Sequence, residues 1–114
     1  MKRDITIYLS DMLEQIEIID TELPAISREE FFSCPFYQNA LIRSLEIIGE
    51  AAKYIPAEVR ETYPQIPWKQ ITGMRDKLAH GYATVDLNAT WNTLIHDIPK
   101  LRDNLLGLLE DFKN

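Results

Sequence analysis

The segment R-D-K-L-A-H-G-Y, residues 75–82, brings a fixed cation, a titratable base and a phenol together within eight positions. The guanidinium of Arg75 is a planar fork that suits a phosphate group. The imidazole of His80 can give or take a proton near neutral pH. Together they form a minimal set for cleaving RNA without a metal ion. By spacing alone, however, an arginine and a histidine on a helix are usually structural or solvated.

Helical geometry limits how this pair could act. Positions five apart on a helix lie about 140° apart around its axis, so Arg75 and His80 do not point the same way from one straight helix. They could converge if His80 lies in a frayed last turn and Gly81 lets the chain turn away. They could also converge if the cleft lies between two copies of the protein.

Two carboxylates four residues apart, Glu46 and Glu50, resemble an acid pair or half of a metal site. No matching Glu-x-x-His is present elsewhere in the chain, which argues against a di-metal centre in a helical bundle. We expect each glutamate to pair at helical spacing with a base such as Arg43 or Lys53. The sequence therefore predicts neither a metal site nor a cofactor.

The remaining reactive or aromatic residues are expected to have structural roles. A single cysteine, Cys34, excludes an internal disulfide and a cysteine-based zinc site, and we expect it to pack as a small hydrophobe. His96 is expected at the surface or at a helix cap. Trp68 and Trp91 are expected in the core and not as platforms for nucleobases.

Composition and charge limit the class of protein. The 114 residues suit one domain, 1–114, and 46% of them are hydrophobic, as in an ordinary globular protein. No apolar run approaches the length of a membrane span or a signal peptide, so we expect a cytoplasmic protein. The net charge is −6, yet residues 68–82 carry three bases and one acid, +2, which leaves −8 elsewhere. This pattern suits a focused phosphate site better than a broad nucleic-acid surface.

Helical periodicity dominates the chain. A first helix is predicted from an N-cap at Asp4 to Pro24, and Ser27 with Glu30 forms a predicted capping box for a short helix. A long helix is predicted from Pro35 until residue 56. A third is predicted over residues 67–80, and a last one from residue 86, kinked or divided at Pro99. These segments predict an all-α, up-and-down bundle of four main helices with short helical segments.

Three stretches carry a family resemblance: LIRSLEIIGEAAKYIP, IPWKQITGMRDKLAHGYATVDLNATW and HDIPKL. Together they resemble the HepT-like toxins of the HEPN superfamily, over almost the whole chain. The diagnostic motif of that family is Arg, a polar residue, three or more others, His, any residue and Tyr. Arg75, Asp76, His80 and Tyr82 fill those places in order.

The resemblance implies a metal-independent endoribonuclease, the toxin of a toxin–antitoxin pair. Arg75 and His80 would be catalytic and Asp76 a supporting motif residue, in a cleft shared by a homodimer. The implied partner is a nucleotidyltransferase antitoxin of the MntA type, which silences the toxin by transferring AMP onto Tyr82. RNA would be cut through the ribose 2′-oxygen, leaving a 2′,3′-cyclic phosphate. Two other readings remain: a non-catalytic helical module that binds the nucleotidyltransferase or a nucleotide, and a structural bundle with no site.

Overall fold

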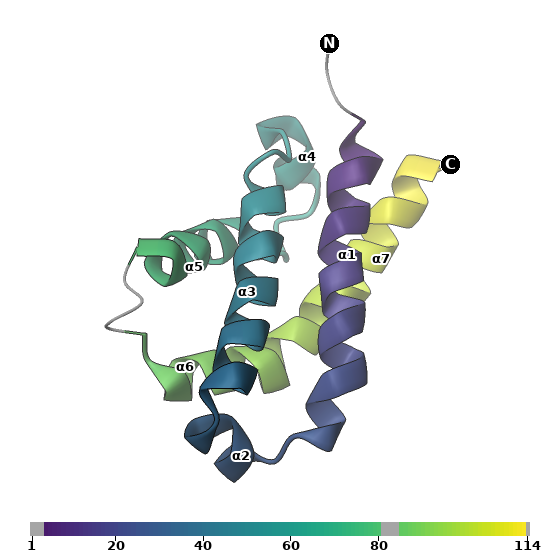
Figure 1. The fold of residues 1–114 in the computed structure, drawn as a ribbon. Helices are drawn as coiled ribbons and strands as arrows, with labels where there is room; N and C mark the ends of the chain where they lie inside the picture. Colours follow the sequence, from purple (N-terminus) through teal and green to yellow (C-terminus); the bar gives the residue numbers. More distant parts are fainter. Residues whose placement is uncertain (1–3, 81–84, 114) are drawn as a thin grey trace.

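The structure, a computed structural model, describes residues 4–80 and 85–113, with the side chains of residues 4–74 and 85–112. These residues form helices and no strand, which confirms the predicted all-α class (Figure 1). In chain order the elements are α1 (Ile5–Glu22), the 3-10 turn η1 (Leu23–Ala25), α2 (Arg28–Ser33), α3 (Pro35–Ala52), α4 (Ala57–Thr62), α5 (Trp68–His80), α6 (Leu87–Asn92), the π-helical turn η3 (Thr93–Asp97) and α7 (Ile98–Lys113).

Four of these helices, α1, α3, α5 and α7, are long and build the bundle. In Figure 1, α1 and α3 run alongside each other, with α7 behind α1 and α5 on the far side of α3. The helix α3 is therefore the central element, because it packs against both α1 and α5. The molecule is elongated, with principal extents of 44 × 27 × 25 Å.

Two predicted helix starts are confirmed, those of α1 and α2. The Asp4 carboxylate accepts a hydrogen bond of 2.9 Å from the Thr6 N–H, which lowers the pKa of Asp4 below its usual range. Ser27 and Glu30 form the expected capping box at α2: the Ser27 hydroxyl accepts from the Glu30 N–H at 3.1 Å, and the Glu30 carboxylate accepts from the Ser27 N–H at 3.0 Å.

The core is built from the apolar stripes of the long helices. Phe31 of α2 is fully buried and packs at 5.2 Å, ring centre to ring centre, against Trp91 of α6, so the short helices close one end of the bundle. The largest fully buried side chains come from five elements and the chain just before α5: Phe31, Leu9, Met12, Ile16, Ile19, Leu45, Ile48, Ile66, Leu94, Ile98, Leu105 and Leu108.

The C-terminal segment is divided close to Pro99, as predicted. Asp86 caps α6 by accepting a hydrogen bond from the Ala89 N–H. The chain then widens into η3, where the Ile98 N–H donates to the Thr93 carbonyl, five residues back. Proline has no N–H to continue an α-helical ladder, and Pro99 occupies the first turn of α7, where that group is not required.

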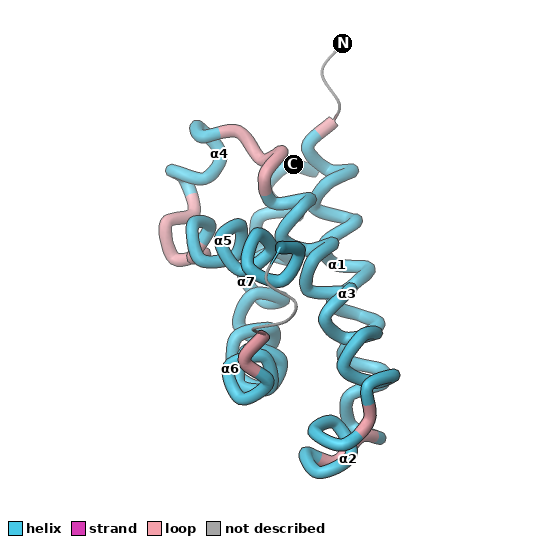
Figure 2. The backbone as a smooth tube through the Cα atoms, turned by 60° about the vertical axis from the view of Figure 1, so that its left-hand side comes forward, coloured by secondary structure: helices cyan, strands magenta, loops and turns pink. Residues whose placement is uncertain are grey.

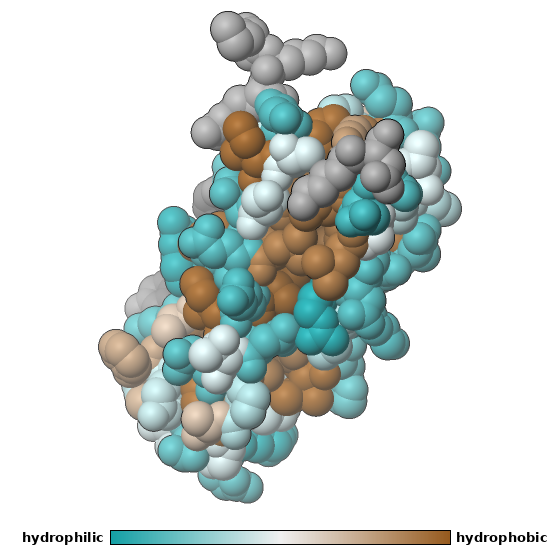
Figure 3. All heavy atoms as spheres, turned by 90° about the vertical axis from the view of Figure 1, so that its right-hand side faces the viewer, coloured by the Kyte–Doolittle hydropathy of each residue, from teal (hydrophilic) through white to brown (hydrophobic). Residues whose placement is uncertain are grey.

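Figure 3 shows apolar side chains gathered on the face that α1 and α7 present. An ion pair joins these two helices. Arg102 donates to the Asp20 carboxylate at 2.9 Å, and this hydrogen bond raises the pKa of Arg102. Leu13 and Leu109 are half-buried there, and Leu106 is exposed. Within the described ranges, every helix falls short of the length or apolar character that a bilayer crossing requires.

Candidate active site

The first turn of α5 is fixed to the end of α3. Trp68 is 7% exposed, and its indole N–H donates to the Tyr63 carbonyl at 3.2 Å. The Arg60 guanidinium lies 5.9 Å from the centre of the Trp68 ring. The same guanidinium donates to the carbonyls of Ala52, at 2.8 Å, and Ile55, at 2.9 Å. One arginine therefore satisfies carbonyls at the end of α3 and contacts the residue that starts α5.

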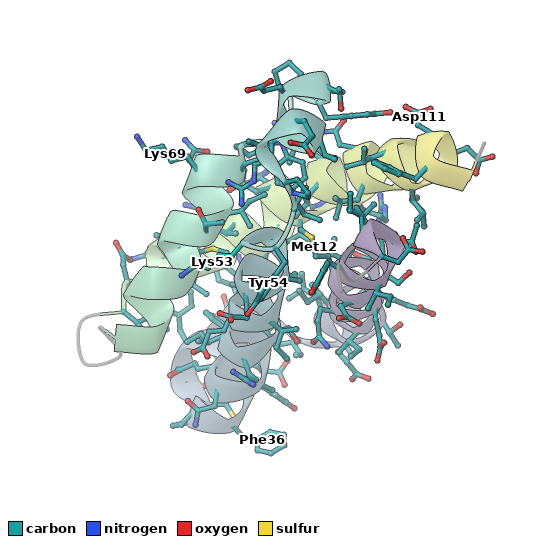
Figure 4. The ribbon with its side chains drawn as sticks, turned by 90° about the horizontal axis from the view of Figure 1, so that it is seen from above. Met12, Phe36, Lys53, Tyr54, Lys69 and Asp111 are labelled. Carbon is teal, nitrogen blue, oxygen red and sulfur yellow. The ribbon has the colours of Figure 1, made fainter. Side chains whose placement is uncertain are left out.

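The register of α5 separates a core-facing stripe from an exposed one. Trp68 and Ile71 are both 7% exposed and belong to the core. Lys69 and Gly73 are exposed, and Figure 4 shows Lys69 on the outer side of α5. Thr72 stays within the helix, where its hydroxyl donates to the Trp68 carbonyl at 3.1 Å. These residues define the two faces of the helix before the motif begins.

The predicted catalytic positions continue this helix. The α5 backbone runs without a break through Arg75, Asp76 and His80. Residues five apart lie about 140° apart around the axis and about 7.5 Å apart along it. In helical register, position 75 follows the buried stripe of Trp68 and Ile71, and position 80 falls on the exposed stripe. The backbone thus places the two motif positions on different faces.

The side chains of Arg75, Asp76 and His80 lie outside the described residues, as does all of Tyr82. Gly81, the predicted stop of the helix, also lies outside them. Both ways in which Arg75 and His80 could converge, within one chain or between two copies, remain predictions. The assignment of the four motif residues rests on the sequence.

The expected ion pairing of the α3 glutamates is confirmed at Glu46, whose carboxylate lies 3.2 Å from the Arg43 guanidinium. These residues line a hollow of about 580 Å³ between α1 and α3, the α1–α3 hollow. Glu50 and Asp11 add two further carboxylates to its lining. In the described parts of the chain, no group of three or more His, Cys, Asp or Glu is placed to hold a metal ion.

A second hollow of about 680 Å³ follows α5 and was not predicted from the sequence. We call it the α5–α7 groove, because its walls are α5 on one side and η3 with α7 on the other. The backbone course of these helices can be followed in Figure 2. Its lining is Ile48, Gln65, Pro67, Gln70, Ile71, Gly73, Met74, Ala89, Thr93, Asp97, Ile98, Lys100, Leu101 and Asn104. These residues come from five helical segments and the chain before α5, and only the packing of those segments brings them together. The one local signal in the sequence is a glycine, Gly73, in the interior of a helix.

The other assignments from the sequence agree with the structure. His96 is exposed on η3. Trp68 is buried in the core, and Trp91 is partly buried and packed against it. Cys34 is a free, half-buried thiol at the junction of α2 and α3.

Comparison with known proteins adds information about the motif. The family model "Ribonuclease HepT-like" matches residues 12–106, a range that contains all of α5. The "Probable ribonuclease HepT" of Thermococcus cleftensis is 45% identical over 90% of this chain and 93% of its own length. The "Putative RNase TTE0752" of Caldanaerobacter subterraneus subsp. tengcongensis is 42% identical over 93% of this chain and 95% of its own.

A third relative is longer. The "Gamma-glutamylcyclotransferase and putative RNase MJ0434" of Methanocaldococcus jannaschii is 45% identical over 97% of this chain, which spans 50% of that protein. No solved structure matches the chain. The family match covers most of the sequence, and relatives above 30% identity are matched along nearly their whole length. The chain therefore belongs to the HepT-like ribonuclease family.

Proposed function

We propose that this protein is a metal-independent endoribonuclease, the toxin of a toxin–antitoxin pair, acting in the cytoplasm as a single domain of residues 1–114. The observation that carries the proposal is the family match over residues 12–106, which includes the complete Arg75–His80 motif on one helix. The names of the relatives, which describe ribonucleases, support the reaction class. The hydrogen bond and the ring contact of Trp68 hold the start of α5, the helix that carries the motif.

The proposed chemistry uses the ribose 2′-hydroxyl as the nucleophile. His80 moves the proton from this hydroxyl or to the leaving 5′-oxygen. The 2′-oxygen forms a bond to phosphorus as the bond to the 5′-oxygen breaks, leaving a 2′,3′-cyclic phosphate and a free 5′-hydroxyl. Arg75 stabilises the negative charge that collects on the other phosphate oxygens. Asp76 is assigned a supporting role as the polar residue of the motif.

A homodimer is part of the proposal. The 140° separation of positions 75 and 80 along one helix supports a site that takes residues from two copies. A two-fold axis would place two arginines and two histidines around one groove. One histidine could then act as base while the other acts as acid.

Silencing is assigned to Tyr82, following the family motif. A nucleotidyltransferase antitoxin of the MntA type would transfer AMP from ATP to the phenol oxygen, releasing pyrophosphate. The added phosphate would compete for the Arg75 guanidinium, and the adenosine would obstruct the site. Co-expression with the antitoxin should add the mass of AMP to the native chain and not to Tyr82→Phe.

The test of the activity uses two histidines of the same chain. Purified protein is incubated with RNA in the presence of EDTA, and the product ends are identified by mass spectrometry. His80→Ala should lose activity by about a hundredfold or more. His96→Ala, the matched control on the exposed face of η3, should keep it. Equal activity in the two variants contradicts the assignment, and RNA binding without cleavage favours the alternative of a non-catalytic binding module.

A further inference from the structure

The α5–α7 groove lies on the same helix as the proposed catalytic histidine. Gln70, Gly73 and Met74 form its α5 wall. Gly73 and His80 are seven residues apart, which places their helix positions about 20° apart around the axis and about 10 Å apart along it. Gly73, at the edge of the groove wall, therefore lies on the same face of α5 as position 80, whereas Gln70 and Met74 lie about 80° and about 120° from it around the axis. A chain-like ligand reacting at His80 would reach the groove within about three stacked nucleotide steps.

The lining of the groove has the chemistry of a nucleobase site. Its floor is apolar, formed by Ile71, Ile98 and Leu101, which are each at most 7% exposed. Amide groups stand at its rim, on Gln70 and Asn104. A flat, apolar ring with donors and acceptors on its edge fits such a surface, and the amide of a glutamine or asparagine can form two hydrogen bonds with the edge of an adenine.

The polar groups at the rim are available for a ligand. The amides of Gln65, Gln70 and Asn104 form no hydrogen bond within the described part of the chain. The ammonium of Lys100 likewise forms no ion pair with any residue described in the structure. It is exposed, and could neutralise a phosphate beside a bound base.

Gly73 supplies an independent observation. Glycine inside a helix is less favourable than alanine, so an interior glycine calls for a reason. A Cβ atom at Gly73 would meet no atom within 4 Å, so no described neighbour within the chain requires the missing side chain. Gly73 is exposed and lines the groove. The described neighbours give no reason for a glycine at this position, but a ligand that approaches the helix backbone closely would give one.

From this arrangement we propose that the α5–α7 groove binds a base of single-stranded RNA up to about three nucleotides from the scissile phosphate and so selects the cleavage site. Gln70 and Asn104 contact the base edge, and Lys100 contacts a neighbouring phosphate. The inference rests on the proposed ribonuclease function, because it places the reacting phosphate near His80. A second copy of the chain is a poorer occupant, since interface centres are aromatic and depleted of charge, whereas this lining has no aromatic residue and includes Lys100 and Asp97.

The experiment measures binding separately from cleavage. Short 2′-O-methyl oligonucleotides of single base composition are titrated into the full chain and followed by fluorescence anisotropy. They lack a free 2′-hydroxyl and cannot be cut by the proposed reaction. The test variant is Gly73→Leu, and its matched control is Gly107→Leu on α7, where a Cβ would also meet no atom within 4 Å. A second test variant, Gln70→Ala, removes one amide without adding bulk.

Gly73→Leu should weaken binding by about tenfold, within the range that one lost base contact costs, and Gly107→Leu should bind as the native chain does. Gln70→Ala should reduce the native preference among the four oligonucleotides. Native binding by Gly73→Leu and Gln70→Ala overturns the proposal, as does a change in the molar mass of Gly73→Leu by light scattering, which would make the groove a contact between copies. If the native protein binds RNA through the groove but does not cut it, the proposed ribonuclease activity is refuted and the proposed binding is not.

Discussion

The two hollows of this molecule are similar in size and opposite in character. The α1–α3 hollow, of about 580 Å³, is lined by Asp11, Glu46 and Glu50 against the single base Arg43. Arg43 is itself engaged by Glu46 at 3.2 Å. A phosphate entering this hollow would meet an excess of negative charge, and the hollow is therefore unsuited to RNA.

The α5–α7 groove, of about 680 Å³, balances one acid, Asp97, with one base, Lys100. The rest of its polar lining is neutral and amide-rich. This contrast shows how a chain with a net charge of −6 could act on a polyanion. What matters is the charge along the path of the substrate, because exposed charges more than about 10 Å away are largely screened by salt. The acids are concentrated elsewhere.

The largest expected difference between the two regions is in catalysis. Arg75→Ala should lower kcat/KM for RNA by about a hundredfold or more, because the developing charge on the phosphate loses its partner. Arg43→Ala, in the α1–α3 hollow, should leave kcat/KM unchanged. Steady-state cleavage of a fluorogenic RNA measures both. Similar losses in the two variants would mean that the α1–α3 hollow takes part in the reaction.

Reversing one charge in each hollow should change RNA binding in one of them and not in the other. Lys100→Glu should weaken RNA binding by about tenfold at low salt and reduce the slope of log K against log salt by about one. Arg43→Glu should leave the slope unchanged, because Arg43 lies in the α1–α3 hollow. Anisotropy titrations over a range of salt concentrations provide the slopes. A reduced slope for Arg43→Glu and a native slope for Lys100→Glu would reverse our assignment.

The α1–α3 hollow should matter more for stability than for activity. Tyr8 and Tyr54 stack across it with ring centres 4.9 Å apart and planes at 9°. Tyr54→Ala should lower the free energy of unfolding by about 1 kcal/mol through loss of this aromatic pair, without changing cleavage. Phe36→Ala, at a side chain that is 75% exposed, is the control and should stay within about 0.5 kcal/mol of native. Urea denaturation measures both.

The smallest expected effect tests whether a ligand approaches the helix backbone at Gly73. Gly73→Ala and Gly107→Ala should each raise the free energy of unfolding by up to about 1 kcal/mol, because alanine favours the helix and neither Cβ meets a neighbour within 4 Å. The two variants should therefore match in thermal unfolding. They should differ in RNA affinity, which only Gly73→Ala lowers. Equal affinity in both would remove the argument that a ligand approaches the α5 backbone.

The local signals in the sequence predicted the ends of helices well, because a cap depends on residues within one turn. Asp4 and the pair Ser27 and Glu30 cap α1 and α2 as expected. The break near Pro99 was also predictable, since a missing N–H acts on its own helix. Its form was not: a π-helical turn depends on how α6 and α7 both keep their apolar faces on the core.

The candidate site likewise has one part that the sequence predicted and one part that it did not. Arg75, Asp76, His80 and Tyr82 could be named from their spacing and family context, because a motif is a property of the chain. The α5–α7 groove could not, because its walls come from separate segments of the chain, residues 70–74 and 93–104, which meet only in the folded bundle. The ion pair of Glu46 with Arg43 needed only a helical spacing, and it was predicted.

The π-helical turn at Thr93–Asp97 has a consequence for comparing relatives by length. A π turn holds one residue more than the α turn it replaces, and here both its first and its last residue line the groove. Deleting one residue between 93 and 97 would let an ordinary α turn replace the wide one, leave the flanking helices nearly in phase and remove one residue from that wall. Among family members, a gap of a single residue at this point would therefore mark a differently shaped groove, recognisable from an alignment without any coordinates.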